Sequence, residues 1–136
     1  METNKVEIYI TEYNKLENRN LVIDSDQHSI WAYVLDSENR IEFDGFICSR
    51  GTLVDTSSNV KEFIENDFQP PLTKNIANEF SIQSEIKNED IKIFWNDNLI
   101  RILINETEFL KMDTLNKKSY SKAVSESGPY GIPLTE

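Results

Sequence analysis

The chain has 136 residues, with 24 Asp and Glu against 14 Lys and Arg and a formal net charge of −10. This length predicts one domain whose core is large enough to fold without metals or disulfides, and the lone cysteine, Cys48, excludes an internal disulfide. The negative charge disfavours general nucleic-acid binding and anionic membrane surfaces. Because the sequence starts without a signal-peptide pattern and has no apolar run of about 20 residues, we expect a cytoplasmic protein.

The first part of the chain predicts antiparallel strands. Residues 5–13 alternate apolar and polar side chains, as in an edge or half-exposed strand, and residues 21–23 begin a second strand. Residues 29–35 and 40–48 are rich in β-branched and aromatic side chains, and the turn-forming residues 36–39 separate them. This pattern predicts a β-hairpin over residues 29–48, in which Gly45 marks a bulge or a close approach of another segment.

Residues 58–80 change to a helical period. Ser58 is a suitable N-cap for apolar residues spaced at intervals of three to five, and Pro70 and Pro71 would end that helix. Thr73 is a suitable cap for a second helix over residues 74–79. We therefore expect one or two short helices within residues 58–80 that cover one face of a sheet.

The strongest strand signal lies in residues 91–104. Two arms, 91–95 and 99–104, are apolar on both faces, and three turn-forming residues separate them. A two-faced apolar hairpin is typical of the middle of a sheet that is covered on both sides. Residues 108–113 fit a further strand of the same meander.

Together these elements predict a single α+β domain over residues 1–127. Its centre is a twisted, mainly antiparallel sheet of about five to seven strands, with one or two short helices within residues 58–80. Residues 128–136 contain two of the four glycines and two of the four prolines. We expect this segment to be an extended or disordered C-terminal tail.

The sequence carries no complete catalytic or metal-binding motif. The only histidine, His28, follows Asp24 and Asp26, and these side chains are of types that bind divalent ions. A closed zinc site takes four ligands, however, and a solvated turn explains the same residues. Glu42 and Asp44 share a strand face, as a pair of catalytic carboxylates would and as ordinary exposed acids also do. We therefore predict no catalytic residues, no bound metal and no cofactor.

Acidic residues and tyrosines occur together near the start of the chain. Residues 1–110 carry 10 basic and 21 acidic side chains, a net charge of −11. Acidic groups around tyrosines suit a basic protein partner, because charge speeds association and aromatic rings anchor the complex; ordinary decoration of an edge strand is the alternative. The residues predicted to bind such a partner are Glu7, Tyr9, Glu12, Asp24, Asp26, Glu42 and Asp44.

Two blocks of the sequence resemble a family of small bacterial proteins known only as a domain of unknown function. In one block, Trp95 and Asp97 form a turn ahead of the strand Leu103-Ile104-Asn105, with Asn98 where the family has a glycine. The resemblance covers residues 30–48 and 91–121 and implies a small α+β bacterial domain without known catalytic residues. The acidic, single-domain profile is also similar to that of immunity proteins of bacterial toxin systems.

These observations lead to three hypotheses. The leading one is a non-catalytic acidic protein-binding domain, such as an immunity-type inhibitor of a basic bacterial toxin. The second is a small metal-dependent or hydrolytic enzyme that uses His28 and the nearby aspartates. The third is a homo-oligomeric structural subunit, such as a homodimer, in which a second copy covers the two-faced apolar strands.

Overall fold

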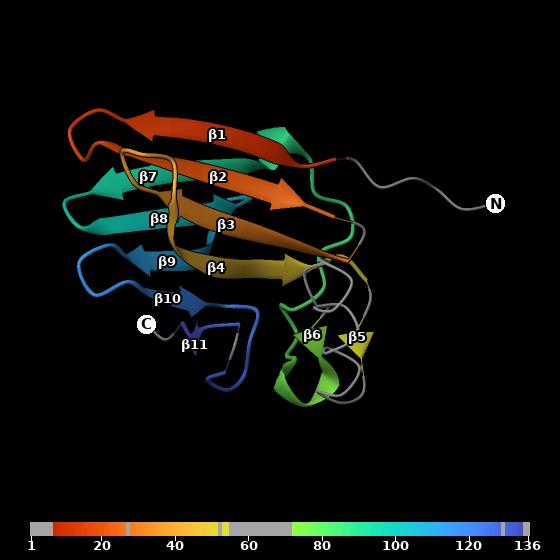
Figure 1. Cartoon of the computed structure of the whole chain (residues 1–136). Coiled ribbons are helices and arrows are strands. Elements are labelled where there is room, and N and C mark those ends of the chain that lie inside the picture. The colour runs from red at the N-terminus through yellow and green to blue at the C-terminus, as the bar shows by residue number, and fades with distance from the viewer. Residues whose placement is uncertain (1–6, 27, 52, 55–71, 129, 135–136) are drawn as a thin grey trace.

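Two β-sheets form most of the protein (Figure 1). The computed structural model describes residues 7–26, 28–51, 53–54, 72–128 and 130–134. The first sheet is an antiparallel meander in the order β1-β2-β3-β4, and the second has the order β11-β10-β9-β8-β7. The strands of the first sheet are β1 (Tyr9–Asn14), β2 (Arg19–Ser25), β3 (Ser29–Leu35) and β4 (Ile41–Ser49). Those of the second are β7 (Ile91–Asn96), β8 (Leu99–Ile104), β9 (Thr107–Asp113), β10 (Lys118–Ser121) and β11 (Ile132–Pro133).

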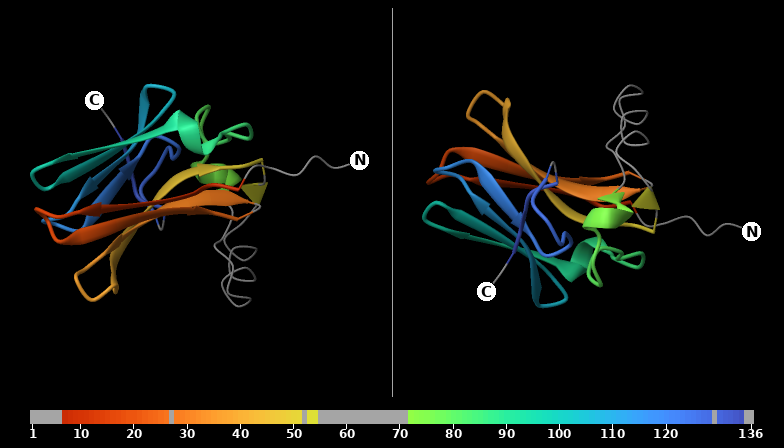
Figure 2. Two further views of the ribbon diagram at one scale, coloured as in Figure 1. Left: turned by 90° about the horizontal axis from the view of Figure 1, so that it is seen from above. Right: turned by 90° about the horizontal axis from the view of Figure 1, so that it is seen from below.

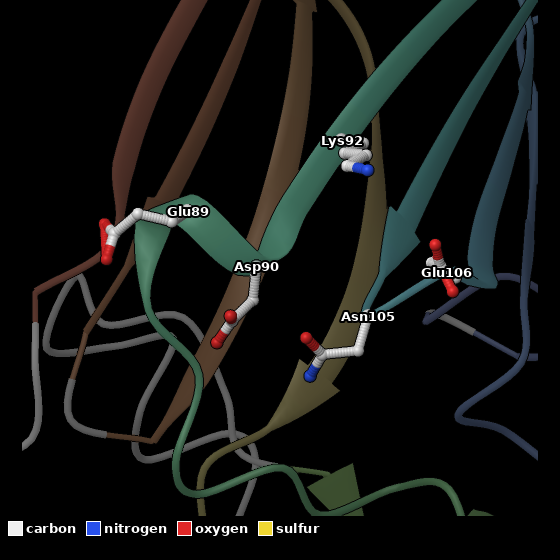
Figure 3. Close-up of a pocket in the computed structure, with 5 residues that line it drawn as sticks. All are labelled: Glu89, Asp90, Lys92, Asn105 and Glu106. Carbon is white, nitrogen blue, oxygen red and sulfur yellow. The ribbon is translucent and has the colours of Figure 1, made fainter.

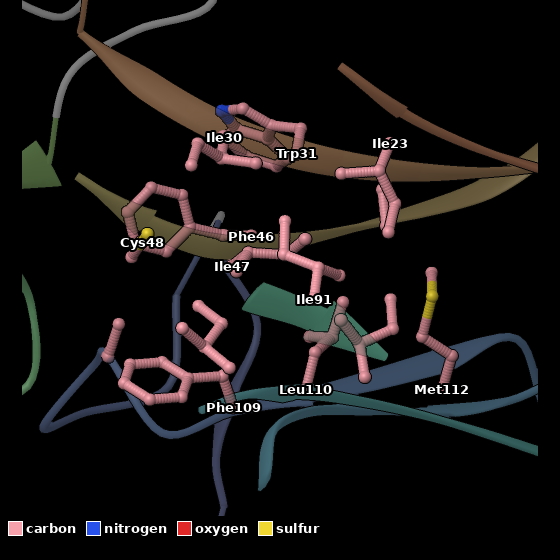
Figure 4. Packing of buried hydrophobic residues seen from close by; sticks show 14 of the residues in the cluster. Ile23, Ile30, Trp31, Phe46, Ile47, Cys48, Ile91, Phe109, Leu110 and Met112 are labelled. Atoms are coloured by element: carbon pink, nitrogen blue, oxygen red, sulfur yellow. The ribbon is translucent and has the colours of Figure 1, made fainter. Parts of the chain in front are cut away.

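The two sheets stack face to face as a β-sandwich (Figure 2). Along each strand, alternate apolar side chains point into the space between the sheets, where removal of their surface from water drives folding. Figure 4 shows this core from close by. Side chains from both sheets that are fully buried there include Leu21, Ile23, Ala32, Val34, Ile100, Ile102, Leu110 and Met112.

The α+β prediction is wrong, because the described part of the chain is built almost entirely from strands. Its helices are two single 3-10 turns, η1 (Lys74–Ile76) and η2 (Asn88–Asp90), and β5 (Leu53–Val54) pairs in parallel with β6 (Leu72–Thr73). Of the expected helical range 58–80, residues 58–71 lie outside the described residues. In the rest, Thr73 ends β6, and only the single 3-10 turn η1 stands where the second helix was expected. Ile76, Ala77 and Phe80 pack against the core from η1 and the turns after it.

The hairpin turns place asparagine and aspartate in left-handed conformations. Asn18, Asn39 and Asp97 have φ angles of 52°, 63° and 53°, which these residues adopt more readily than most others. In the turn from β8 to β9, Asn105 and Glu106 both have positive φ, 48° and 73°, as a tight two-residue hairpin requires. The hairpins predicted over residues 29–48 and 91–104 are confirmed as β3–β4 and β7–β8.

The apolar pattern of residues 91–104 predicted a hairpin in the middle of its sheet, and this position is only half right. Strand β8 is central, but β7 is the edge strand, and Phe94 on its outer face is 49% exposed. At the other edge of this sheet, β11 pairs in parallel with β10, and Tyr130 just before it is buried. The described part of the C-terminal segment therefore adds a strand to the sandwich.

Direct contacts hold the two sheets together on both sides of the sandwich. On one side, the Ser119 hydroxyl donates a hydrogen bond to the Asp44 carbonyl oxygen at 2.5 Å, beside Gly45. On the opposite side, the Trp95 indole N–H donates to the Glu12 carboxylate at 2.9 Å and so joins β7 to β1. These contacts fix the two sheets relative to each other.

Candidate protein-binding face

The outer face of the first sheet places tyrosines directly opposite aspartates. In the strand register, Tyr9 on β1 lies opposite Asp24 on β2, and Tyr33 on β3 lies opposite Asp44 on β4. Tyr13 stands on the same face two positions along from Thr11, and Tyr9 and Tyr13 are 59% and 58% exposed. We call these five residues, Tyr9, Tyr13, Asp24, Tyr33 and Asp44, the acid–tyrosine face.

The two aspartates of this face carry negative charge that no cation balances among the described residues. Both side chains are exposed at the surface, and neither takes part in an ion pair in the described part of the chain. Partial removal from water raises the pKa of Asp24 above its ordinary value, and the carboxylates of Glu7 and Asp26 add to this effect. Partial removal from water also raises the pKa of Asp44. At neutral pH both carboxylates are therefore held charged at a cost to folding.

The structure places Glu7 and Asp26 next to this face. Glu7 precedes β1 and is exposed, while its backbone carbonyl accepts a hydrogen bond from the Asn88 side chain at 3.1 Å. The Asp26 carboxylate accepts hydrogen bonds from the backbone N–H groups of His28 and Ser29, at 2.7 and 2.9 Å. Asp26 therefore shapes the turn between β2 and β3, and its charge lies close enough to influence Asp24.

Two of the residues predicted to bind a partner point inward from the sheet instead. The Glu12 carboxylate is bound to Trp95, as described above, and Glu42 forms a salt bridge with Arg19 at 2.6 Å. Hydrogen bonding to Glu42 is the largest cause that raises the pKa of Arg19. Both acids therefore bind partners within the chain. Tyr33, which the sequence reasoning did not include, joins the face because the β3–β4 register sets it opposite Asp44.

The histidine-containing turn shows no arrangement suited to a metal ion. Among the residues that the structure describes, no group of three or more His, Cys, Asp and Glu side chains is placed to hold one. Cys48 is fully buried, and burial raises the pKa of its thiol to about 12. Such a thiol is a poor nucleophile, because attack requires the thiolate.

An open polar pocket lies beside the start of β7 (Figure 3). Its lining residues come from η2, from β7 and from the turn after β8: Glu89, Asp90, Lys92, Asn105 and Glu106. The Asp90 carboxylate accepts a hydrogen bond from the Lys87 backbone N–H at 2.9 Å, which closes η2. A cluster of exposed acids without a buried polar group aimed into it is typical of an ordinary solvated surface.

Comparisons with family models, with curated proteins and with solved structures found no match to this chain. The resemblance to a bacterial domain of unknown function and the similarity to immunity proteins therefore stay predictions. Within the described part of the chain, no helix is long and apolar enough to cross a membrane.

Proposed function

We propose that this protein is a non-catalytic binding domain that uses its acid–tyrosine face to engage a basic protein. The observation that carries the proposal is the pair of cross-strand contacts Tyr9–Asp24 and Tyr33–Asp44 on an outer sheet face without a balancing cation in the described residues. The partner class that we propose is a basic bacterial toxin domain, which the protein would inhibit as an immunity protein in the cytoplasm.

The physical basis is that each exposed aspartate lies beside an aromatic ring. An arginine or lysine of a partner that approached Asp24 would meet a carboxylate and the ring of Tyr9 together, which combines charge pairing with a cation–π contact. Tyrosine and arginine are also the residues that most often dominate binding energy in protein interfaces. The net charge of −10 would speed the encounter with a basic partner at low salt.

The raised pKa values of Asp24 and Asp44 support a binding role. A carboxylate that destabilises the free protein gains most when a cation of a partner neutralises it, and groups of this kind gather at functional sites. By contrast, Glu12 and Glu42 already have partners within the chain and contribute to the fold. We therefore propose that Asp24, Asp44 and the tyrosines opposite them supply most of the binding energy. Glu7 and Asp26 would lie at the rim of the interface.

Binding of a basic toxin domain tests the proposal through two matched variants. Calorimetry with the double variant Asp24→Asn/Asp44→Asn should show an affinity about ten- to a hundredfold weaker than that of the unchanged chain. The control Glu89→Gln/Glu106→Gln removes two exposed acids from the polar pocket and should bind like the unchanged chain. Affinity should also fall as salt is added. Equal losses of affinity in both variants, or an affinity that does not change with salt concentration, would contradict the proposal.

The enzyme hypothesis and the binding hypothesis make opposite predictions for His28. A metal-dependent or hydrolytic enzyme would lose bound metal or activity in His28→Ala, whereas a binding domain would keep its affinity for the basic partner. Among the described residues, no group of three or more His, Cys, Asp and Glu side chains could hold the metal ion that a metal-dependent enzyme needs.

A further inference from the structure

The outer face of the second sheet carries a row of aromatic and cationic side chains. In the strand register, Phe94 on β7 lies opposite Arg101 on β8, Arg101 opposite Lys111 on β9, and Lys111 opposite Tyr120 on β10. We call these four residues, Phe94, Arg101, Lys111 and Tyr120, the cation–aromatic row. Phe94 is 49% exposed, Arg101 is exposed, and the Lys111 amine lies 5.5 Å from the centre of the Tyr120 ring.

This row places two positive charges directly opposite each other. Like charges at facing positions of neighbouring strands destabilise a sheet, and no carboxylate forms an ion pair with Arg101 or Lys111 among the described residues. Lys92 and Lys118 stand on the same outer face, where Glu108 and Asp113 are the acids in register. Four cations against two carboxylates give this face a local charge of +2 on a chain whose net charge is −10.

The two outer faces of the sandwich are therefore complementary. The first sheet presents Asp24 and Asp44 with exposed tyrosines, and the second presents Arg101 and Lys111 with Phe94 and Tyr120. Both are sheet surfaces on opposite sides of the molecule (Figure 2). We infer that the occupant of the cation–aromatic row is a second copy of this chain, which docks through its acid–tyrosine face.

Charge and symmetry give this contact recognisable properties. Copies that are each strongly acidic repel one another at long range, but at about 0.15 M salt that repulsion is screened beyond about 8 Å. The opposite charges of the touching faces then dominate the contact. The two faces differ and lie on opposite sides of the molecule, so the contact is head-to-tail. Such a contact builds chains of copies rather than a closed symmetric dimer.

The inference goes beyond the proposed function and does not depend on it. A basic partner and a second copy would use the same acid–tyrosine face, so self-association would compete with the partner. Self-association needs the cation–aromatic row as well, whereas binding of a basic partner does not. Variants of the row therefore separate the two claims.

Sedimentation velocity of the full chain at several concentrations, near physiological salt, tests the inference with two charge-reversed variants. Arg101→Glu/Lys111→Glu makes the row negative, and Asp24→Lys/Asp44→Lys makes the acid–tyrosine face positive. Each variant alone should associate at least about tenfold more weakly than the unchanged chain. An equimolar mixture of the two variants should regain association, because each then offers the face that the other lacks. Circular dichroism shows whether each variant keeps its strand content.

A matched control separates this contact from a general effect of net charge. Lys15→Glu/Lys117→Glu changes the net charge by the same amount as Arg101→Glu/Lys111→Glu, but at exposed positions in hairpin turns, outside the strands that carry the two faces. This control should associate like the unchanged chain, and its mass should grow with concentration. A chain that stays monomeric at every concentration would overturn the inference. So would a closed dimer that survives in Arg101→Glu/Lys111→Glu, or a mixture that fails to associate. Binding of a nucleic acid or an acidic protein at Arg101 by a chain that remains monomeric would also overturn it.

Discussion

Replacing Gly45 by alanine should destabilise the protein, because the two sheets approach each other closely at this position. A Cβ atom added to Gly45 would lie 2.9 Å from Leu110 Cδ2 and 3.0 Å from Ser119 Oγ. Carbon atoms in good contact are about 3.5–4.0 Å apart, so the neighbours would have to move. Leu110 is fully buried, and the Ser119 hydroxyl is bound to the Asp44 carbonyl oxygen, which leaves both with little freedom to do so.

The expected loss is the difference between two effects. Overpacking of a filled core costs about 1–3 kcal/mol. Alanine restricts the unfolded chain more than glycine does, which returns about 0.5–1 kcal/mol. We therefore expect Gly45→Ala to lower the free energy of unfolding by about 1–2 kcal/mol, and to lower the melting temperature by about 3–8 °C for a chain of this size.

Urea unfolding of Gly45→Ala and of Gly128→Ala measures this effect against a matched control. Among the residues that the structure describes, a Cβ atom at Gly128 would meet only Ile76 Cδ1, at an ordinary 3.5 Å. The control should therefore keep or slightly raise the stability of the protein. Shortening the neighbour in the double variant Gly45→Ala/Leu110→Val should cost less than the sum of the two single changes. A stable Gly45→Ala variant, or strictly additive losses, would refute the close packing of the sheets at this position.

Three further predictions follow from single contacts. Trp95→Phe removes the hydrogen bond to Glu12 and should lower the free energy of unfolding by about 1–3 kcal/mol, measured by urea unfolding. A loss in Trp95→Phe/Glu12→Gln that equals the sum of the losses in the two single variants would show that the bond contributes nothing. Cys48 should resist alkylation in the native protein and react once urea unfolds it, because its thiol is buried with a pKa of about 12. Mass spectrometry measures the labelling, and rapid labelling of the folded chain would contradict the burial of Cys48. Asp44→Asn should stabilise the protein at neutral pH, because the raised pKa of Asp44 means that its charged form destabilises the fold. That gain should vanish in unfolding curves as the pH falls below about 3.9, where the carboxyl is protonated in both states.

The sequence predicts the individual strands better than it predicts how they are arranged in space. Hairpins β3–β4 and β7–β8 follow from local signals, namely β-branched runs that end at Asp or Asn turn residues, and these signals act within a few residues. The closure of two sheets into a sandwich depends on contacts between distant residues, such as Trp95 with Glu12, which no periodicity reveals. The α+β prediction failed for a related reason. Three apolar residues near position 76 fit a helical stripe, but they equally well pack onto the sandwich from irregular structure.

The candidate site was predictable in part. Tyr9 and Asp24 were singled out from composition and alternation, but their pairing across β1 and β2 needed the strand register. Glu12 resembles a surface acid because it is next to the exposed Tyr13 in the sequence. Its position in β1, however, turns its side chain toward the other sheet, where it bonds Trp95. The cation–aromatic row escaped the sequence reasoning entirely, since its members come from four strands and only the sheet brings them into one line.

The central claim is that a basic protein binds on the outer face of the first sheet. The measurement that tests it most directly is a nuclear magnetic resonance map of the contact surface, recorded on the isotopically labelled chain in complex with a basic toxin domain. Our account predicts that the strongest perturbations centre on Tyr9, Tyr13, Asp24 and Asp44, and that any changes on the outer face of β7–β10 are only those that the free chain also shows on dilution. Perturbations centred on Phe94 and Arg101, or on the polar pocket around Glu89, would contradict it.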